Sequence, residues 1–409
     1  MKLLNFGSCN IDYVYQLDHI VLAGETESSS ELKIFPGGKG LNQSIAVSRA
    51  GTEIYHAGAI GKDGEMLLNL LKGNGVNVKF LKTLDKKTGH AIIQVASSGE
   101  NSIVIHSGAN GCIDKEYIDF VLANFSSNDF LLLQNEISNI EYIIDKAFEK
   151  GMKIILNPSP INERIKLIDI NKISYLILNQ TEAQALTGCS EESSSLEYFK
   201  KNHPFTRIIL TLGKKGSIYM GDNQKYYQPS YQVDAIDTTA AGDTFTGYFI
   251  SGLIKGLSLK NNMKIASCAS AIAVTRKGAA PSIPTYLDVK NNVSTMKLNK
   301  YSLEDEKIKG IIESVIEDNI ATVSILDIAH KIGYSSVYTG ALIKKLFGIT
   351  YKELLLEKRL TIAKEALKNS NLTIAEITTM VGYENQGYFR KKFAQKFGKK
   401  PLDYKKDYR

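Results

Sequence analysis

One stretch decides the fold of this chain: Asp237-Thr238-Thr239-Ala240-Ala241-Gly242-Asp243-Thr244-Phe245. Small residues here lead into an apolar helix, so the backbone can approach a ligand closely, and the first N–H groups of a helix favour negative charge. We therefore predict that Ala240, Ala241 and Gly242 form an anion hole for a phosphate. Asp243 is then placed to accept a proton from an attacking hydroxyl as general base. An isolated Gly-Asp pair would favour the alternative, a helix-capping aspartate without a catalytic role.

The sequence before this stretch alternates short β-branched runs with longer amphipathic segments. Candidate strands are residues 129–133, 153–156, 175–178 and 207–212, and residues 140–149 have helical spacing. This pattern is typical of an α/β fold with a doubly wound, mostly parallel sheet covered by helices on both faces. Residues 14–35 and 89–106 depart from the pattern. The second segment alternates as an antiparallel hairpin, and both are predicted to form a small β lid over the active edge.

The C-terminal part has a different organisation. Residues 286–302 are polar and rich in Asn and Lys, which indicates a linker. We place one domain at 1–288, the linker at 289–304 and an all-α domain at 305–409. Within that last domain the pattern of residues 327–334 recurs in residues 376–383, and each copy continues through an amphipathic helix to a Phe-Gly pair. Two copies of one helical unit are therefore predicted.

Composition and charge narrow the function classes. The chain has 409 residues and a net charge of +7, of which about +6 lies in residues 305–409, where 19 basic residues face 13 acidic ones. A basic tail on a nearly neutral body favours contact with a polyanion, although a solvated surface is the alternative. No apolar run reaches the roughly 18 residues of a membrane span, and the N-terminus lacks a signal-peptide pattern, so we expect a cytoplasmic protein. The four cysteines form no C-x-x-C pair, which argues against zinc or a disulfide framework.

Two motifs resemble the signatures of the ribokinase-like (PfkB) carbohydrate kinases, and the resemblance covers about residues 1–285. One is Pro36-Gly37-Gly38-Lys39-Gly40-Leu41-Asn42, and the other is the 237–245 stretch. Within the family the match looks closest to the ribokinases, because of four further segments at residues 7–12, 107–110, 157–160 and 273–279. The resemblance implies ATP-dependent phosphorylation of a pentose, with D-ribose to D-ribose 5-phosphate as the leading reaction.

The resemblance also assigns site residues. Short carboxylates, amides and bare glycine backbone suit sugar hydroxyls, and the implied sugar-binding residues are Asn10, Asp12, Gly38, Lys39, Gly40, Asn42, Glu136 and Asp243. The implied ATP-binding residues are Asn179, Thr211, Leu212, Gly213, Lys214, Lys215, Gly216, Gly242 and Ser267. Asn179 and Glu182 would position Mg2+ through water, although many relatives have Glu where this chain has Gln180. A monovalent cation, K+, is implied beside Asp237, Thr239, Ala273, Arg276, Gly278 and Ser282.

The tail resembles the DNA-binding domain of the AraC/XylS family over about residues 305–409. The two recognition helices implied by this resemblance are residues 336–347 and 386–397, which would enter the major groove of double-stranded DNA. Leu342, Leu346, Phe389 and Phe393 are expected to be core anchors. The exposed candidates for DNA contact are Ser335, Ser336, Tyr338, Thr339, Asn385, Gln386, Arg390 and Lys391. Relatives often place Arg where this chain has Gly340-Ala341, so the second unit is expected to supply more of the affinity.

Three functional hypotheses remain open. The leading one is a bifunctional protein that phosphorylates a pentose and regulates transcription. Its partners would be a sugar, ATP and DNA, and by analogy with relatives of the kinase it would form a homodimer. The second is a transcription factor whose kinase-like domain senses a sugar or nucleotide without turnover. A retained general base and anion hole argue against it, because a sensor needs binding groups but no catalytic base. The third is a metabolic kinase with a vestigial tail.

Overall fold

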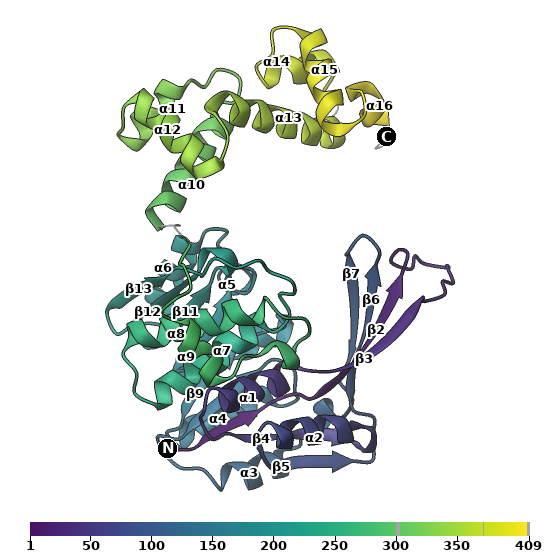
Figure 1. Ribbon diagram of the computed structural model, residues 1–409, viewed down its shortest axis with the longest axis vertical. Coiled ribbons are helices and arrows are strands. Elements are labelled where there is room, and N and C mark those ends of the chain that lie inside the picture. The colour runs from purple at the N-terminus through teal and green to yellow at the C-terminus, as the bar shows by residue number, and fades with distance from the viewer. Residues whose placement is uncertain (300–302, 371, 407–409) are drawn as a thin grey trace. The chain divides into compact units, whose positions relative to one another are not determined.

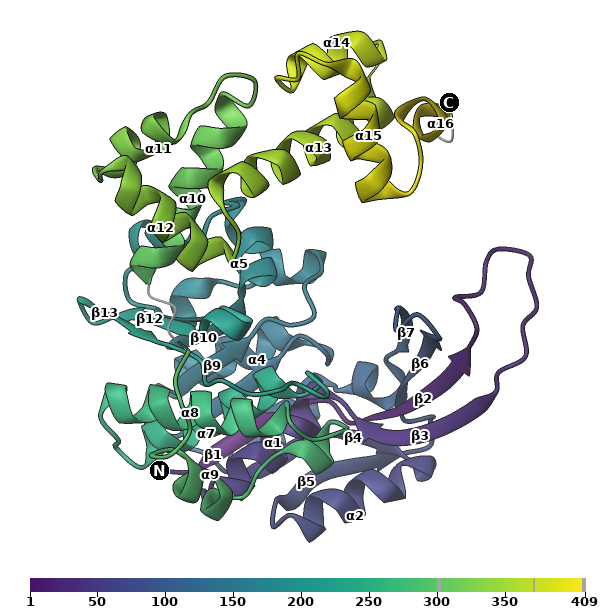
Figure 2. The same ribbon diagram turned by 45° about the horizontal axis from the view of Figure 1, so that its top comes forward.

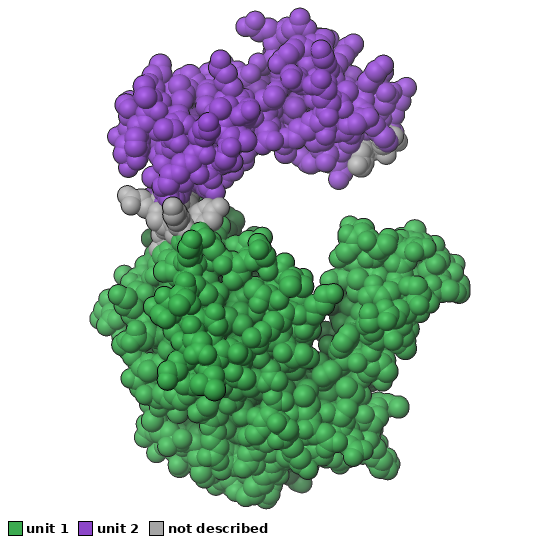
Figure 3. All heavy atoms as spheres, in the orientation of Figure 1, with its two compact units in different colours: residues 1–300 green, residues 301–409 purple. Residues whose placement is uncertain are grey.

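The computed structural model describes residues 1–299, 303–370 and 372–406. The chain forms two compact units, residues 1–300 and 301–409 (Figure 3). In the part of the chain that is described, no helix has both the length and the apolar character needed to cross a lipid bilayer.

A nine-stranded sheet forms the centre of the first unit, in the order β13-β12-β11-β10-β9-β8-β1-β4-β5 (Figure 1). The two pairings that involve β12 are antiparallel, and the others are parallel. The four strands predicted from sequence are β8 to β11, each within one residue of the expected ends. The strands of this sheet are β1 Leu3–Phe6, β4 Tyr55–Gly61, β5 Asn77–Leu84, β8 Phe130–Gln134, β9 Lys153–Asn157, β10 Tyr175–Asn179, β11 Arg207–Thr211, β12 Ser217–Gly221 and β13 Gln224–Gln228.

Helices cover both faces of this sheet, which confirms the predicted α/β class (Figure 1). Successive side chains of a strand point to opposite faces, and Leu131, Leu132 and Leu133 of β8 are all fully buried, so neither face meets water there. The helices of this unit are α1 Lys39–Arg49, α2 Glu65–Gly73, α3 Lys115–Leu122, α4 Ile140–Glu149, α5 Gln180–Thr187, α6 Glu192–Asn202, α7 Ala241–Ile254, α8 Leu259–Ala273 and α9 Tyr286–Asn292.

A second, four-stranded sheet projects from the first unit in the order β3-β2-β6-β7 (Figure 2). Its strands are β2 Asn10–Leu17, β3 Glu31–Gly37, β6 Gly89–Ala96 and β7 Asn101–His106. The predicted hairpin is the antiparallel pair β6 and β7, and β2 and β3 also pair antiparallel. At the root of this sheet, Asn10 lies in register with both Gly37 and Gly89, so the glycine-rich signature and the sugar-binding candidates of β2 begin side by side.

The second unit is helical and contains the predicted repeat. Its helices are α10 Leu303–Asp318, α11 Ile325–Ile332, α12 Ser336–Phe347, α13 Tyr351–Asn369, α14 Ile374–Met380, α15 Gln386–Phe397 and α16 Pro401–Lys406. Two apolar cores form, one between α10, α11, α12 and the start of α13, and the other between the end of α13, α14 and α15. Capping boxes start both repeats, at Ser324 with Asp327 and at Thr373 with Glu376. The predicted recognition helices are α12 and α15.

The first unit continues beyond the boundary predicted at residue 288. Helix α9 ends at Asn292, and Leu298 forms an isolated antiparallel bridge with Tyr231. Asn299 donates through Nδ2 to the Lys214 carbonyl at 3.2 Å. Most of the polar segment 289–299 therefore packs on the first unit. Residues 300–302 of the predicted linker lie outside the described residues.

Candidate active site and candidate DNA interface

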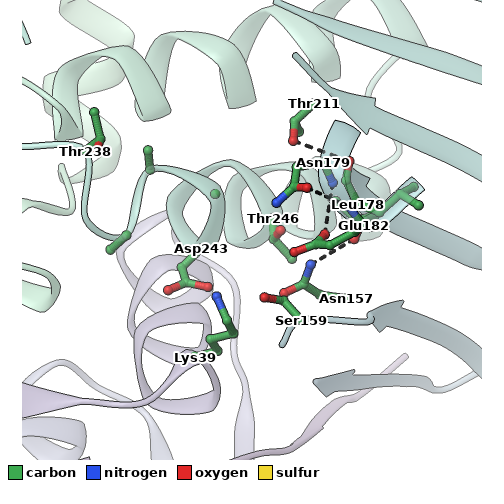
Figure 4. A pocket seen from close by; sticks show the side chains of 14 residues that line it. Lys39, Asn157, Ser159, Leu178, Asn179, Glu182, Thr211, Thr238, Asp243 and Thr246 are labelled. Atoms are coloured by element: carbon green, nitrogen blue, oxygen red, sulfur yellow. Dashed lines mark hydrogen bonds between the residues drawn. The ribbon is translucent and has the colours of Figure 1, made fainter. Parts of the chain in front are cut away.

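A pocket of about 220 Å3 opens where α7 begins (Figure 4). Its walls come from the carboxyl ends of the parallel strands β9, β10 and β11 and from the N-terminal ends of α1, α5 and α7, the edge at which open α/β sheets bind ligands. The lining residues are Lys39, Asn157, Ser159, Ile177, Leu178, Asn179, Glu182, Thr211, Thr238, Ala240, Ala241, Gly242, Asp243 and Thr246.

Asp243 is held at the start of α7 by two amides of α1. Gln43 donates from Nε2 to Asp243 Oδ1 at 2.9 Å, and Asn42 donates from Nδ2 to Oδ2 at 3.1 Å. The Lys39 amine points toward the same carboxylate (Figure 4). Burial disfavours the Lys39 charge, but Asp243 and then Glu136 outweigh it and raise the pKa of Lys39. The carboxylate is thus fixed in direction and faces a cation.

Gln43 contacts Asp243 directly but was not among the site residues predicted from the sequence. It is fully buried, and its Oε1 accepts from Gln134 Nε2 at 2.7 Å while its own Nε2 also reaches Asn157 Oδ1 at 3.2 Å. Its amide orientation is therefore set by partners on β8 and β9. The signal was present in part, because Gln43 directly follows the glycine-rich signature.

Replacing Gln43 with leucine is expected to lower kcat about tenfold or more, because a hydrogen bond to a charged group is lost and the base is oriented less well. KM for the sugar should change less than twofold, since Asn42 remains. Steady-state kinetics and a thermal melt on the same sample check this. A parallel rise in KM for both substrates with a large loss of Tm would instead indicate a purely structural role.

The residues of the predicted anion hole lie where the chain turns into α7. Ala240 adopts a left-handed conformation, with φ of 59°, and α7 begins at the next residue. The first N–H groups of a helix have no intrahelical partner, although the Ala241 N–H makes a long turn hydrogen bond of 3.3 Å to Thr238 O. A Cβ on Gly242 would meet open space, so the backbone there lies bare to the pocket. Gly242 is the best exposed of the three predicted residues.

The predicted sugar-binding residues come together at the root of the small sheet. Glu136 Oε2 accepts from the Lys39 backbone N–H at 2.9 Å and from the Ser8 hydroxyl. Asn10 Oδ1 accepts from Asn110 Nδ2 at 2.8 Å, so Asn110 orients it. A Cβ on Gly37 would lie 2.1 Å from an Asp12 oxygen, which shows how closely the signature backbone approaches that carboxylate.

One buried polar atom of this set lacks a hydrogen-bond partner in the described part of the chain. Asn42 Oδ1 is buried and has no hydrogen-bond partner within the described residues. A buried acceptor without a partner costs about 1–3 kcal/mol. A sugar hydroxyl would satisfy it, so the donor and acceptor chemistry here fits a polyol.

The pKa of Asp12 predicts a pH dependence for sugar use. Burial, and then the charge of Glu136, raise the pKa of Asp12 to about 6. Below pH 6 the carboxyl becomes neutral and loses acceptor capacity, so kcat/KM for the sugar should fall about tenfold per pH unit, as for a single titrating group of the unliganded enzyme. The measurement is a pH profile of kcat/KM at saturating ATP. Asp12→Asn should be weaker at neutral pH and lack a limb with this midpoint, and persistence of that limb would contradict the assignment.

The predicted nucleotide residues divide into two groups. Asn179 and Thr211 lie opposite each other in β10 and β11 and line the pocket, together with Glu182 and Gly242. Residues 212–216 follow β11 directly, but they do not line this pocket. Ser267 is buried in α8 and donates to Pro229 O at 3.4 Å. The roles of residues 212–216 and of Ser267 in ATP binding stay predictions.

Asn179 and Glu182 form a capping box at the start of α5. The Asn179 backbone N–H donates to Glu182 Oε2, and the Glu182 backbone N–H donates to Asn179 Oδ1, both at 2.9 Å. Only Oε2 of Glu182 serves the cap, and the side chain lines the pocket. A carboxylate at this place fits a hydrated divalent cation, because Mg2+ prefers oxygen ligands and keeps several waters.

The predicted K+ residues lie on two adjoining loops. The backbone N–H groups of Ile236 and Asp237 both donate to Val274 O, at 2.8 and 3.1 Å. The Asp237 carboxylate accepts from the N–H groups of Thr239 and Gly278, each at 2.9 Å. Two of the other predicted side chains have partners: Arg276 pairs with Asp288 at 3.3 Å, and Ser282 donates to Ala279 O at 2.8 Å. A cation here would rely mainly on backbone carbonyls, and the K+ site stays a prediction.

The candidate DNA interface lies at the N-terminal ends of α12 and α15. Ser335 and Asn385 cap these helices by accepting from the N–H groups of Tyr338 and Tyr388. Gln386, Arg390 and Lys391 are exposed. The four expected core anchors are buried, which confirms that prediction; they are Leu342, Leu346, Phe389 and Phe393.

The burial of Thr339 differs from the predicted interface. We expected it to be exposed, but its side chain is fully buried against the core of the first repeat. The physical reason is helical spacing: Thr339, Leu342 and Ile343 lie three and four residues apart and therefore on one face. Ser336 is half-buried, while Tyr338 is 52% exposed.

Comparisons with known proteins agree with this geometry. Residues 1–286 match the pfkB family carbohydrate kinases, and residues 328–407 match a helix-turn-helix domain. The ribokinase of Haemophilus influenzae is 36% identical over 292 residues, which cover 68% of this chain and 94% of that protein.

Two solved structures are similar to the first unit. The ribokinase of Cryptococcus neoformans in complex with ADP has 37% identity and a TM-score of 0.63, covering 71% of this chain and 99% of its own. The ribokinase of Arabidopsis thaliana complexed with ribose and ATP has 27% identity and a TM-score of 0.63, covering 74% and 99%. The chain belongs to the pfkB family of carbohydrate kinases and carries, after its kinase domain, a helix-turn-helix domain of the AraC type.

Proposed function

We propose that this kinase transfers the γ-phosphoryl group of ATP to the terminal hydroxyl of a pentose, with D-ribose to D-ribose 5-phosphate as its main reaction. The observation that carries the proposal is the Asp243 carboxylate, oriented by Gln43 and Asn42 at the N-terminus of α7 and beside the pocket. Ribose is favoured because the ribokinases of Haemophilus influenzae and Cryptococcus neoformans match the domain at 36% and 37% identity.

The residues of the site divide the work of the reaction. Asp12, Asn10 and Glu136 hold the ring hydroxyls, while the bare backbone of the glycine-rich signature lets the sugar approach α1. Asp243 accepts the proton as the sugar oxygen attacks the phosphorus. The N–H groups around Gly242 and the Lys39 amine offset the charge on the transferring group. The interactions of the N–H groups and of Lys39 with the transferring group strengthen in the transition state. They therefore raise kcat rather than only the affinity for the substrate.

Two cations complete the proposal. Mg2+ would be positioned through water by Glu182 and Asn179, where it would neutralise charge on the ATP phosphates. K+ would lie among the carbonyls of the Asp237 and Val274 loops. Turnover should require Mg2+ and should increase when K+ replaces Na+ at constant ionic strength.

The experiment is a coupled ADP-release assay with Mg2+ and K+ over a panel of ribose, 2-deoxyribose, other pentoses, hexoses and nucleosides. Ribose-dependent turnover with the highest kcat/KM of the panel supports the proposal. Turnover highest with another sugar would correct the substrate, and sugar binding without turnover would favour a sensor that only binds its ligand.

We also propose that the helix-turn-helix domain binds specific operator DNA and regulates transcription. Its support is the pair of capped helices α12 and α15 and the positive charge of residues 305–409. Phosphate contacts release counterions, so the affinity for an operator selected from random duplexes should fall steeply with salt. Absence of binding to any duplex at low salt would leave the chain as a kinase with a vestigial tail.

A homodimer through the small sheet is a third part of the proposal. Exposed apolar side chains gather on its strands, and soluble monomers rarely expose large apolar patches. They are Leu32, Ile34, Ile92, Ile103, Val104 and Ile105. Sedimentation should give a dimer mass that Ile34→Lys and Val104→Lys convert to a monomer mass, and a monomeric parent protein would contradict this.

A further inference from the structure

The two recognition helices differ in the chemistry they present. Both are capped one residue before they begin, at Ser335 and Asn385, so their positions correspond with an offset of 50 residues. Arg390 and Lys391 of α15 correspond to Gly340 and Ala341 of α12. Between residues 336 and 343, α12 has no Lys or Arg at all.

The polar side chains at the start of α12 are mostly occupied or buried. The Ser335 hydroxyl accepts the helix-capping bond from the Tyr338 N–H. Thr339 is fully buried, and Ser336 is half-buried. Val337 is 83% exposed, and Ala341, one helical turn later, is also exposed. Helical residues four apart share a face.

Tyr338 stands beside this face in a fixed position. Its ring packs on the ring of Tyr334, with 4.9 Å between the centroids. This contact restricts Tyr338 and leaves Val337 as the side chain that protrudes. An exposed valine at the N-terminal end of α12 contributes little to folding, because the protein itself removes only a small part of its surface from water.

The readout chemistry available to such a face is narrow. Guanine is usually read by Arg or Lys, adenine by Asn or Gln, and cytosine by Asp or Glu, whereas apolar side chains contact the C5-methyl group of thymine. In helix-turn-helix proteins the N-terminal residues of the recognition helix contact the base edges. Small residues at positions 340 and 341 also let the helix backbone lie close to the groove floor.

We propose that α12 reads thymine methyl groups through Val337 and Ala341, so that one half of the operator is specified by thymines at these contacts, while α15 reads the other half by hydrogen bonds and charge. This inference rests on the proposed DNA binding and adds the base class that the first repeat selects.

The test begins with selection of high-affinity duplexes by the full chain. Each thymine of the selected site is then replaced singly by deoxyuridine, which removes only the methyl group. At one or two thymines of one half-site we expect about fourfold weaker binding, the amount that one buried methyl contributes. In the other half-site the same replacement should change affinity less than 1.5-fold.

Val337→Ala makes the test specific. Alanine favours the helix and the position is exposed, so the fold is kept. The variant should bind the parent operator at least about fourfold more weakly. The deoxyuridine at the Val337 contact should then cost clearly less than it does in the parent chain, while any deoxyuridine effect at the Ala341 contact should stay. Leu326→Ala, an exposed apolar residue of α11, is the matched control and should leave the whole pattern unchanged.

The outcomes separate the two proposals. Specific binding without a deoxyuridine effect that depends on Val337 overturns thymine readout and leaves DNA binding intact; it would assign the apolar tip of α12 to a protein partner. Failure to select any duplex removes the DNA-binding function itself.

Discussion

Asp243→Asn is expected to reduce kcat for sugar phosphorylation by a factor of about 10^3, within the range that a positioned general base contributes. Asparagine has nearly the same shape as aspartate but cannot accept the hydroxyl proton. In the variant an NH2 group replaces one carboxylate oxygen of Asp243. This NH2 group would face the donor amide of Gln43 or of Asn42, so one hydrogen bond to the side chain would be lost. The variant should still bind the sugar and ATP, because Asp12, Glu136 and the strand ends are untouched.

The measurement combines single-turnover kinetics with calorimetric binding of the sugar. Asp114→Asn is the matched control, since Asp114 is a helix-starting carboxylate that caps α3 through the Tyr117 N–H at 2.7 Å and lies outside the pocket. It should keep full activity. If Asp243→Asn lost less than tenfold in kcat but melted several degrees lower, Asp243 would be a helix cap rather than the base.

The fold was predictable where local signals agree. Strands β8 to β11 are short buried runs of Leu and Ile separated by helices, and for these strands the sequence prediction is within one residue of the structure. The boundary after residue 288 was less predictable. Polar residues 289–299 look like a linker, but they are held by contacts with Tyr231 and Lys214, far away in the sequence.

The site was predictable for residues inside motifs and much less so for their supports. Asn42 and Asp243 belong to signatures, whereas Gln43 acts through a hydrogen bond that spans 200 residues and cannot be read from one sequence. Thr339 is a different case, because the repeat itself contains the signal. It corresponds to Phe389, which was expected in the core, so burial at position 339 follows from the offset of 50 residues.

Gly40→Ala is expected to destabilise the kinase domain by about 3 kcal/mol and to abolish most of its activity. An added Cβ would lie 2.3 Å from the Ser8 backbone nitrogen and 2.6 Å from Gly7 Cα. These neighbours are main chain at the junction of β1 and β2, so they cannot rotate away. Helix α1 must then move, and with it Lys39, Asn42 and Gln43.

Thermal unfolding and kcat/KM distinguish this effect from a loss of glycine flexibility alone. Gly73→Ala is the control. Gly73 is the last residue of helix α2, and a Cβ added there would have nothing within 4 Å, so this variant should be neutral or stabilised by up to about 1 kcal/mol. Because α1 carries both amides that orient Asp243, Gly40→Ala should lose activity even at temperatures where the domain is fully folded. A folded variant with unchanged kcat would mean that α1 can shift without disturbing the base, and the positioning assigned to Gln43 and Asn42 would fail with it.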